Sequence, residues 1–284
     1  MIAASTSRRS GLPLTLLPLL ALAACGSGDG ADNGQPPPGF DPARFVAPAV
    51  PLDAPQVASD AAVVDAMLAM ARVRPDDLVY DLGSGDGRVL IAAARSYGAR
   101  GFGVDIDPNA VRQATENARA AGVAGRVTFR RQDLFETPLN DADVVTLYLT
   151  PEVNLRLRPR LLAEMRPGAR VVSEDFDMGD WRPTAHQRVG ETDLFMWIIP
   201  AQLGGRWRLV FDGRTVPLDL RQQYQRLEGT LGEDWRIGQG WVTGTRVELV
   251  ADTDRGPRRF EGQLQAGRLV SSTEGDNWFA VRID

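Results

Sequence analysis

The stretch LVYDLGSGDGR, residues 78–88, decides the fold. Its first five residues are apolar except for Asp81, and they predict a buried strand. The strand runs directly into glycines at alternate positions, Gly83, Gly85 and Gly87, and then into an alanine-rich helix. A glycine-rich turn between a strand and a helix lets a ligand approach the backbone closely and offers it N–H donors. We therefore expect a nucleotide-like cofactor at this turn, although a glycine-rich turn alone is also compatible with a plain tight turn.

The rest of the segment from Asp60 to residue 200 alternates between strand and helix patterns. Apolar runs predict further strands at 101–106, 127–132, 143–149 and 169–173, with the last strands drawn from 187–199. Helices are expected between them, and Pro159 is expected to break one of these helices in two. Strands separated by helices of this length predict an α/β, doubly wound parallel sheet with helices on both faces. A ligand of such a sheet binds at the carboxyl ends of the strands.

Acidic residues mark three of those strand ends. Asp81 lies two residues before the first glycine, Asp105 ends the second expected strand, and Asp133 ends the third. A carboxylate at the second strand end can bind both hydroxyls of a ribose. The spacing differs from the dinucleotide pattern, because Arg88 stands where that pattern has its third glycine. Asp133 lies where an adenine edge would be, with a solvated surface acid as the alternative.

These residues together resemble the class I S-adenosylmethionine-dependent methyltransferases. The resemblance covers residues 57–200 and implies a seven-stranded sheet with an antiparallel last strand. It implies S-adenosylmethionine as the cofactor, with the glycine loop against its methionine moiety. Residues 81–94 are most similar to the group that includes lysine methyltransferases of the mitochondrial ATP synthase c subunit. The cofactor residues it implies are Asp81, Gly83, Ser84, Gly85, Gly87, Asp105, Ile106, Asp133 and Leu134.

The methyl acceptor is expected near the ends of the fourth and fifth strands. Tyr148 and Glu152 follow the fourth strand, where the family often places substrate-facing residues, and Asp175 follows the fifth. Any of them could assist deprotonation of an acceptor amine. The alternatives are a helix capped by Thr150 with a solvated Glu152, and a solvated acidic loop at Asp175. The acceptor itself stays open between a protein, with lysine as one option, and a small molecule.

The first 24 residues have the pattern of an export signal. Arg8 and Arg9 precede an uncharged, mostly apolar segment at 11–24, which is too short to span a bilayer. Leu22-Ala23-Ala24-Cys25 resembles the lipobox of bacterial lipoproteins, which implies cleavage before Cys25 and its lipidation. The protein is then expected in the cell envelope, anchored to a membrane through Cys25, with Gly26 favouring the outer membrane. Residues 25–56, rich in proline and glycine, are expected to form a tether.

The segment 201–284 has a different pattern. Short alternating runs, separated by turn residues such as Asp212-Gly213, predict a small antiparallel β barrel or sandwich. Its tryptophans are candidates for the core, which is the favoured interpretation because aromatic residues supply much of a small core, or for a ligand-stacking surface. They are Trp207, Trp235, Trp241 and Trp278.

Composition limits the chemistry further. The chain has 32 basic residues, all of them arginine, and 37 acidic ones, for a net charge of −5, which disfavours nucleic acid as a partner. A single histidine, His186, and a single cysteine exclude an intrachain disulfide and disfavour His/Cys metal sites and nucleophile pairs.

Three hypotheses follow: an active methyltransferase, a non-catalytic lipoprotein that binds an adenosine-like ligand, and an envelope module that acts through its β domain. The intact glycine loop and the strand-end carboxylates favour the first. An exported methyltransferase needs a cofactor that is made in the cytoplasm. Export with bound cofactor, methylation before export, or a wrongly assigned start codon would each explain how an enzyme with an export signal obtains a cytoplasmic cofactor.

Overall fold

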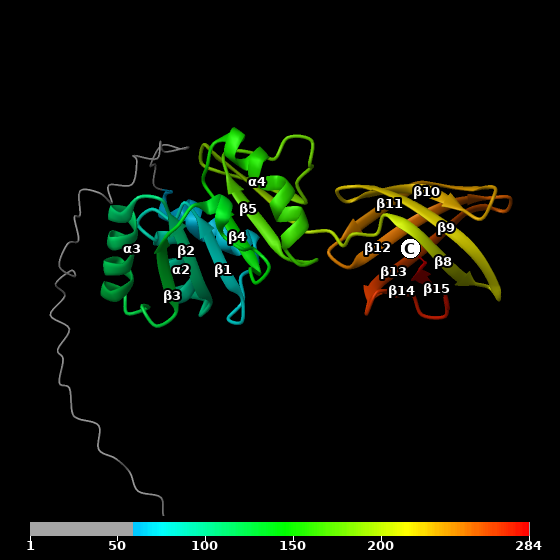
Figure 1. Cartoon of the computed structure of the whole chain (residues 1–284), viewed down its shortest axis with the longest axis horizontal. Helices are drawn as coiled ribbons and strands as arrows, with labels where there is room; N and C mark the ends of the chain where they lie inside the picture. Colours follow the sequence, from blue (N-terminus) through cyan, green and yellow to red (C-terminus); the bar gives the residue numbers. More distant parts are fainter. Residues whose placement is uncertain (1–58, 284) are drawn as a thin grey trace, which may run out of the picture. The chain divides into compact units, whose positions relative to one another are not determined.

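A computed structural model describes residues 59–283 (Figure 1). The expected signal peptide (1–24), the tether (25–56) and the lipidation site Cys25 lie outside the described residues. The two folded parts that follow, an α/β sheet and a β barrel, are treated in turn.

Within residues 59–283, the first part is a seven-stranded sheet with the order β3-β2-β1-β4-β5-β7-β6. Strands β1 to β5 run parallel, and β7 runs antiparallel to both of its neighbours, β5 and β6. This confirms the doubly wound sheet with an antiparallel strand. The strands are β1 (Leu78–Leu82), β2 (Arg100–Asp105), β3 (Val127–Arg131), β4 (Val144–Leu147), β5 (Arg170–Glu174), β6 (Ala185–Val189) and β7 (Thr192–Ile198).

Helices cover both faces of this sheet, because successive strand residues point to opposite sides. Val79 on β1 joins a core cluster with helices α1, α2 and α3, whereas its neighbour Tyr80 joins a second cluster with α4. The order of the strands reverses between β1 and β4, which places a ligand crevice at the carboxyl ends of these two strands. The helices are α1 (Ala61–Met70), α2 (Arg88–Tyr97), α3 (Pro108–Ala120), the short 3₁₀ helix η2 (Leu134–Glu136) and α4 (Pro151–Glu164).

Helix α4 is continuous, so the expected break at Pro159 is wrong. Thr150 caps its start, where the side-chain oxygen accepts a hydrogen bond from the Val153 N–H. Pro159 removes only the hydrogen bond that would reach the carbonyl of Leu155, and both residues lie on the exposed side of the helix. Water can satisfy that carbonyl, and the buried side chains of Leu157 and Leu161 hold the helix to the sheet.

The second part is a closed barrel of eight antiparallel strands, all within the described chain. The ring closes between its last and first strands, β15 and β8, where Ala280 pairs with Leu209. Arg282 reinforces the closure by donating hydrogen bonds to the carbonyls of Gln202 and Gly204, both at 2.8 Å. The strands are β8 (Gly205–Phe211), β9 (Arg214–Gln223), β10 (Arg226–Leu231), β11 (Trp235–Thr243), β12 (Arg246–Thr253), β13 (Gly256–Gln265), β14 (Arg268–Ser271) and β15 (Phe279–Arg282).

Aromatic side chains fill the interior of the barrel. Phe260 packs edge-on against Trp278, with ring centroids 5.6 Å apart, and Trp207 is 1% exposed. Gly262 makes room for this packing, because a Cβ at that position would lie 2.5 Å from the Trp278 ring. Of the expected core tryptophans, Trp207 and Trp278 are buried and Trp235 is partly buried, whereas Trp241 is exposed.

Candidate active site

The carboxyl ends of five adjacent parallel strands bring the candidate residues to one edge of the sheet. Asp81 and the glycine loop lie at the end of β1, Asp105 ends β2, and Asp133 follows β3. Tyr148 follows β4 and Asp175 follows β5. Because β1 pairs with both β2 and β4, the loop lies at the centre of this edge.

The glycine loop is held in a conformation that few other residues adopt. Gly83, Gly85 and Gly87 have φ angles of 89°, 50° and 81°, in the left-handed region. The N–H groups of Gly83 and Ser84 both donate to the carbonyl of Val104 at 2.9 Å, which fixes the loop on β2. A Cβ on Gly87 would lie 2.6 Å from the Phe129 ring, whereas one on Gly85 would meet nothing within 4 Å. The loop is therefore packed on its inner side and open at Gly85.

Asp105 connects the glycine loop to the end of β2. One carboxylate oxygen accepts a hydrogen bond from the Gly85 N–H and the other accepts one from the Asp107 N–H, both at 2.9 Å. Each oxygen keeps a second lone pair for a further donor. Asp105 is therefore placed where it can bind a ligand hydroxyl while it orders the loop. Ile106, the next residue, is half-buried.

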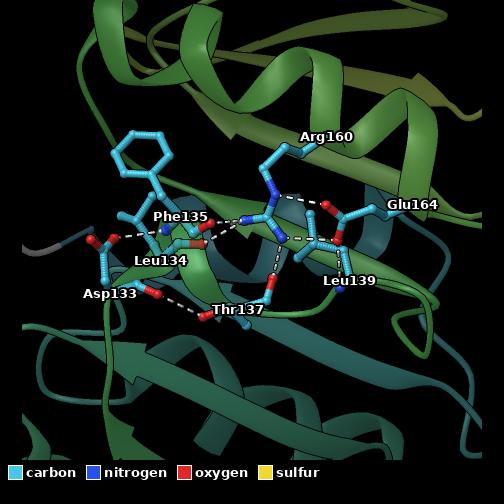
Figure 2. Close-up of polar contacts among 7 residues, drawn as sticks. All are labelled: Asp133, Leu134, Phe135, Thr137, Leu139, Arg160 and Glu164. Carbon is cyan, nitrogen blue, oxygen red and sulfur yellow. Dashed lines mark hydrogen bonds and ion pairs between the residues drawn. The ribbon is translucent and has the colours of Figure 1, made fainter.

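Asp133 and Leu134 begin the loop that follows β3. Asp133 accepts a hydrogen bond from the Phe135 N–H at 2.8 Å and so caps η2, and Leu134 is half-buried. Figure 2 shows that Arg160, on α4, points into this loop. Its guanidinium donates to the carbonyls of Phe135 and Thr137 and pairs with Glu164 at 2.7 Å.

Asp81 is a buried carboxyl group, 6% exposed, on β1. Thr146 on β4 donates a hydrogen bond to it at 2.8 Å. Burial raises the pKa of Asp81 to about 7; the Thr146 hydrogen bond opposes this rise, and the negative charges of Asp105, Asp86 and Glu174 add to it. A positively charged ligand group would relieve the crowding of negative charge here.

A second acidic group lies at the ends of β4 and β5. Glu174 is 3% exposed and accepts a hydrogen bond from the Ser59 hydroxyl, and burial raises its pKa. Burial also raises the pKa of Tyr148, with further contributions from the charges of Glu174 and Asp175 and from a hydrogen bond with Asp175. Tyr148, Glu174 and Asp175 thus form one cluster, which we call the acidic cluster.

Asp175 is held in place by the neighbouring strand. Its φ of 61° lies in the left-handed region, which Asp tolerates better than most residues other than glycine. Its N–H donates to the carbonyl of Asp193 at 2.7 Å, and the Asp193 N–H donates to its carboxylate at 3.2 Å. Such strain at a strand end is typical of functional sites.

The structure does not bring Glu152 or His186 into the acidic cluster. Glu152 is exposed in the first turn of α4, as the capping alternative expected. His186 is exposed on β6, where its ring contacts the Asp193 carboxylate at 2.8 Å and stacks on Phe195.

Sequence reasoning missed Glu174, Ser59 and Arg160. Glu174 had a usable signal, because it directly follows the expected strand at 169–173, where the carboxyl end of a strand meets the crevice. The contacts of Ser59 and Arg160 join segments more than 20 residues apart, so no local pattern could indicate them.

Comparison with known proteins places this site among methyltransferases. Residues 81–185 match the family model described as the ANTKMT methyltransferase domain. A protein-lysine N-methyltransferase of Saccharolobus islandicus (strain REY15A) is 42% identical over 130 residues, which cover 45% of this chain and 81% of that protein. The adenine nucleotide translocase lysine N-methyltransferase of Mus musculus is 38% identical over 146 residues, covering 51% of this chain and 62% of that protein.

A solved structure agrees in fold. The RNA methyltransferase from Salinibacter ruber, in complex with S-adenosyl-L-homocysteine, is 50% identical, with a TM-score of 0.51. The match covers 52% of this chain and 96% of that chain. The matched half corresponds in length to the α/β sheet.

Proposed function

Because this chain belongs to the family of the Saccharolobus islandicus protein-lysine N-methyltransferase, and is an S-adenosylmethionine-dependent methyltransferase, we propose that it methylates the side-chain amine of lysine in another protein. The observation that carries this proposal is the acidic cluster at the ends of β4 and β5, beside the glycine loop. An amine acceptor arrives as an ammonium ion, and the carboxylates of Glu174, which is buried, and Asp175, which is exposed, attract and orient that charge.

The residues at the strand ends fit S-adenosylmethionine. The Ser84 hydroxyl is buried without a hydrogen-bond partner in the described structure, and Gly85 faces open space, so the loop can receive a polar ligand. The glycine loop and Asp81 would hold the methionine moiety, with its ammonium group near Asp81. Asp105 would bind the ribose hydroxyls, and Asp133 with Leu134 would flank the adenine. When bound, the cofactor supplies a methyl group that its sulfonium charge has already activated.

The acidic cluster can prepare the acceptor for direct displacement. The lysine nitrogen must lose a proton before its lone pair can attack the methyl carbon, while the carbon–sulfur bond breaks and its electron pair stays on sulfur. Glu174 suits the role of proton acceptor because burial raises its pKa, and a carboxylate with a raised pKa is a stronger base. Tyr148 and Asp175 would orient the amine, and the protein would exclude competing water.

The charge of the protein favours a protein acceptor over RNA. The chain carries a net charge of −5, and its candidate site gathers Asp81, Glu174 and Asp175. A polyanion would meet repulsion at such a site. The similar Salinibacter ruber protein is named an RNA methyltransferase, so RNA is the alternative acceptor that the test must include.

The absence of lysine from this sequence makes the test unusually direct. The purified protein is incubated with S-adenosylmethionine carrying a radioactive methyl group and a cellular protein extract, or total RNA in a parallel reaction. Acid hydrolysis and amino-acid analysis then identify the product. Because the chain contains only arginine among its basic residues apart from His186, any methyllysine must come from the acceptor protein and not from self-methylation.

We expect label in methyllysine, and we expect Glu174→Gln to reduce it at least tenfold without weakening cofactor binding. Glu152→Gln is the matched control, since Glu152 is exposed outside the acidic cluster. Label in RNA nucleosides, with none in methyllysine, contradicts the lysine proposal. Cofactor binding without transfer to either acceptor would favour the non-catalytic adenosine-binding hypothesis.

We further propose that lipidated Cys25 anchors the protein to a membrane of the bacterial cell envelope, with the outer membrane favoured. The support is the signal-peptide pattern and the lipobox at residues 22–25. Over residues 59–283, none of the helices has the length and apolar character needed to cross a membrane.

A further inference from the structure

Trp241 differs from the other tryptophans of this protein. The chain has six, and four of them, Trp181, Trp197, Trp207 and Trp278, are at most 2% exposed. Trp235 is partly buried in the barrel core. Trp241, on β11, is 43% exposed. Its indole offers a flat apolar face on which the ring of a ligand can stack, and it lies beside a hollow.

The surroundings of Trp241 form such a hollow on the outside of the barrel. It has a volume of about 310 Å³ and spans strands β10, β11 and β12. Arg226 on β10 and Glu248 on β12 are the direct cross-strand neighbours of Trp241, and Glu228 and Gln239 complete the polar rim.

The backbone of β11 is irregular beside this hollow. The strand has a bulge between Ile237 and Gln239, and its glycines, Gly238 and Gly240, stand on either side of Gln239. Gly240 lets β11 pack closely on β10, because a Cβ there would lie 2.7 Å from the Cβ of Leu227, whereas Gln239 lines the hollow beside Trp241. Bulges and glycines of this kind are common where a ligand approaches a strand.

The rim argues for a neutral ligand that is rich in hydroxyl groups. The rim contains one arginine and two glutamates, and this excess of negative charge disfavours a phosphate chain. Both glutamates already have arginine partners, since Arg226 lies 3.5 Å from Glu228 and Arg259 lies 2.8 Å from Glu248, which disfavours a cation. Arginine, glutamate and glutamine remain able to donate to and accept from hydroxyl groups.

We propose that this hollow binds a neutral oligosaccharide, with a pyranose ring stacked on Trp241 and its hydroxyl groups bonded to the polar rim. The C–H face of a pyranose is apolar and flat, so it matches an exposed indole, whereas its edges carry hydroxyl groups. A few polar groups that fix the orientation of a ligand over an apolar surface are typical of small-molecule sites. This activity belongs to the barrel and is separate from methyl transfer.

The test is calorimetric titration of the full-length protein with four neutral tetrasaccharides: cellotetraose, maltotetraose, laminaritetraose and chitotetraose. We expect at least one to bind saturably, with a dissociation constant on the order of 1 mM. Trp241→Ala should weaken that binding at least tenfold, whereas Trp241→Phe should keep most of it. Thr243→Ala, two residues along the same strand and outside the hollow, is the matched control and should bind as the natural protein does. Circular dichroism checks that each variant is folded.

Three outcomes would overturn the proposal. The first is that none of the four sugars binds at concentrations up to about ten times that constant. The second is sugar binding that Trp241→Ala leaves unchanged, since the ligand would then lie elsewhere. The third is that an oligothymidylate or a lysine peptide binds at Trp241 while the sugars do not, which would assign the hollow to a polyanion or a cation.

Discussion

Asp81 should make cofactor binding depend on pH. Its pKa of about 7 means that it is largely protonated in the free protein below neutrality. A bound ammonium group favours the ionised form, so binding releases a proton and affinity should rise from about pH 5.5 to about pH 7.5 and then level off. Calorimetry in buffers of different ionisation enthalpy measures both effects. Asp81→Asn should bind more weakly at pH 8 and lose the pH dependence.

Asp76→Asn is the control for this experiment, because Asp76 is exposed and its charge is not among those that raise the pKa of Asp81. An unchanged pH dependence in Asp81→Asn would show that another group releases the proton.

The pH dependence of folding stability has the opposite sign to that of cofactor binding. Since the pKa of Asp81 in the folded protein lies above its ordinary value of 3.8, stability without cofactor falls as the pH rises towards 7.

Asp105 should be the most sensitive single residue for cofactor affinity. Asp105→Ala removes the expected ribose contacts and also the acceptor of the Gly85 N–H. Hydrogen bonds to a charged group are worth about 1.5–3 kcal/mol each, so affinity should fall about tenfold to a hundredfold. Titration calorimetry with S-adenosylmethionine measures this. Equal affinity in the variant and the natural protein would refute the proposed cofactor site.

Asp107→Ala is the neighbouring control. Its side chain accepts from the Asn109 N–H at 2.8 Å and caps α3, so its loss should cost about 1 kcal/mol of stability and little affinity. Asp105 also has a structural role. A strand-end carboxylate that faces only a ligand would leave the fold untouched, but this one also orders the glycine loop, so Asp105→Ala should lower the melting temperature as well.

The site residues that the sequence predicted are those whose positions could be counted from the glycine motif. The glycine motif fixed the end of β1, and Asp105 and Asp133 then followed from the same strand–helix rhythm. Glu174 was missed because the expected strand ended one residue early, at 173. A strand boundary carries no sharp signal, so the residue at which a strand ends is the least certain part of a prediction from sequence.

At the scale of elements, Arg160 should connect α4 to the adenine side of the cofactor site. Its guanidinium donates to carbonyls of the loop 133–137 and pairs with Glu164, as Figure 2 shows. Arg160→Gln should therefore lower stability by about 2–3 kcal/mol and weaken cofactor binding several-fold, because the loop loses its charged donor. Urea unfolding and calorimetry measure the two effects.

Arg188→Gln is a matched control for this variant. Arg188, near the end of β6, also donates to backbone carbonyls, those of Gly190 and Glu191 in the β6–β7 turn. It should leave cofactor affinity unchanged. If Arg160→Gln binds the cofactor as tightly as Arg188→Gln, the loop after β3 does not need this brace for binding.

Two elements show where local patterns stop being informative. Pro159 predicts a break in α4, yet the packing of Leu157 and Leu161 against the sheet outweighs one lost hydrogen bond. The alternating runs after residue 204 predict β strands correctly, but they leave barrel and sandwich open. That choice depends on whether β15 pairs with β8, which are about 70 residues apart in the chain.

At the scale of the whole molecule, the α/β sheet should bind the cofactor without the barrel. The proposed cofactor residues all precede residue 135, and the acidic cluster ends at Asp175. A truncated protein containing residues 57–200 should bind S-adenosylmethionine within about threefold of the full chain, as measured by calorimetry. If the truncated protein is folded by circular dichroism but does not bind, the barrel contributes to the site.

Membrane attachment should depend on one residue. Cys25→Ala removes the only thiol of the chain and with it the expected lipid. Cell fractionation should then find the variant in the supernatant, while the natural protein sediments with membranes after a high-salt wash. If the variant still sediments, the lipoprotein proposal is wrong.

The closure of the barrel between β15 and β8 has a consequence for how the chain tolerates shortening. In the complete ring every strand has a partner on both sides, so no row of backbone donors and acceptors is left open. Loss of the final strand would uncover two such rows at once, one on β8 and one on β14. Open rows of this kind are templates on which strands of other molecules can pair. The last few residues, which form only a small part of the barrel, therefore protect it against self-association.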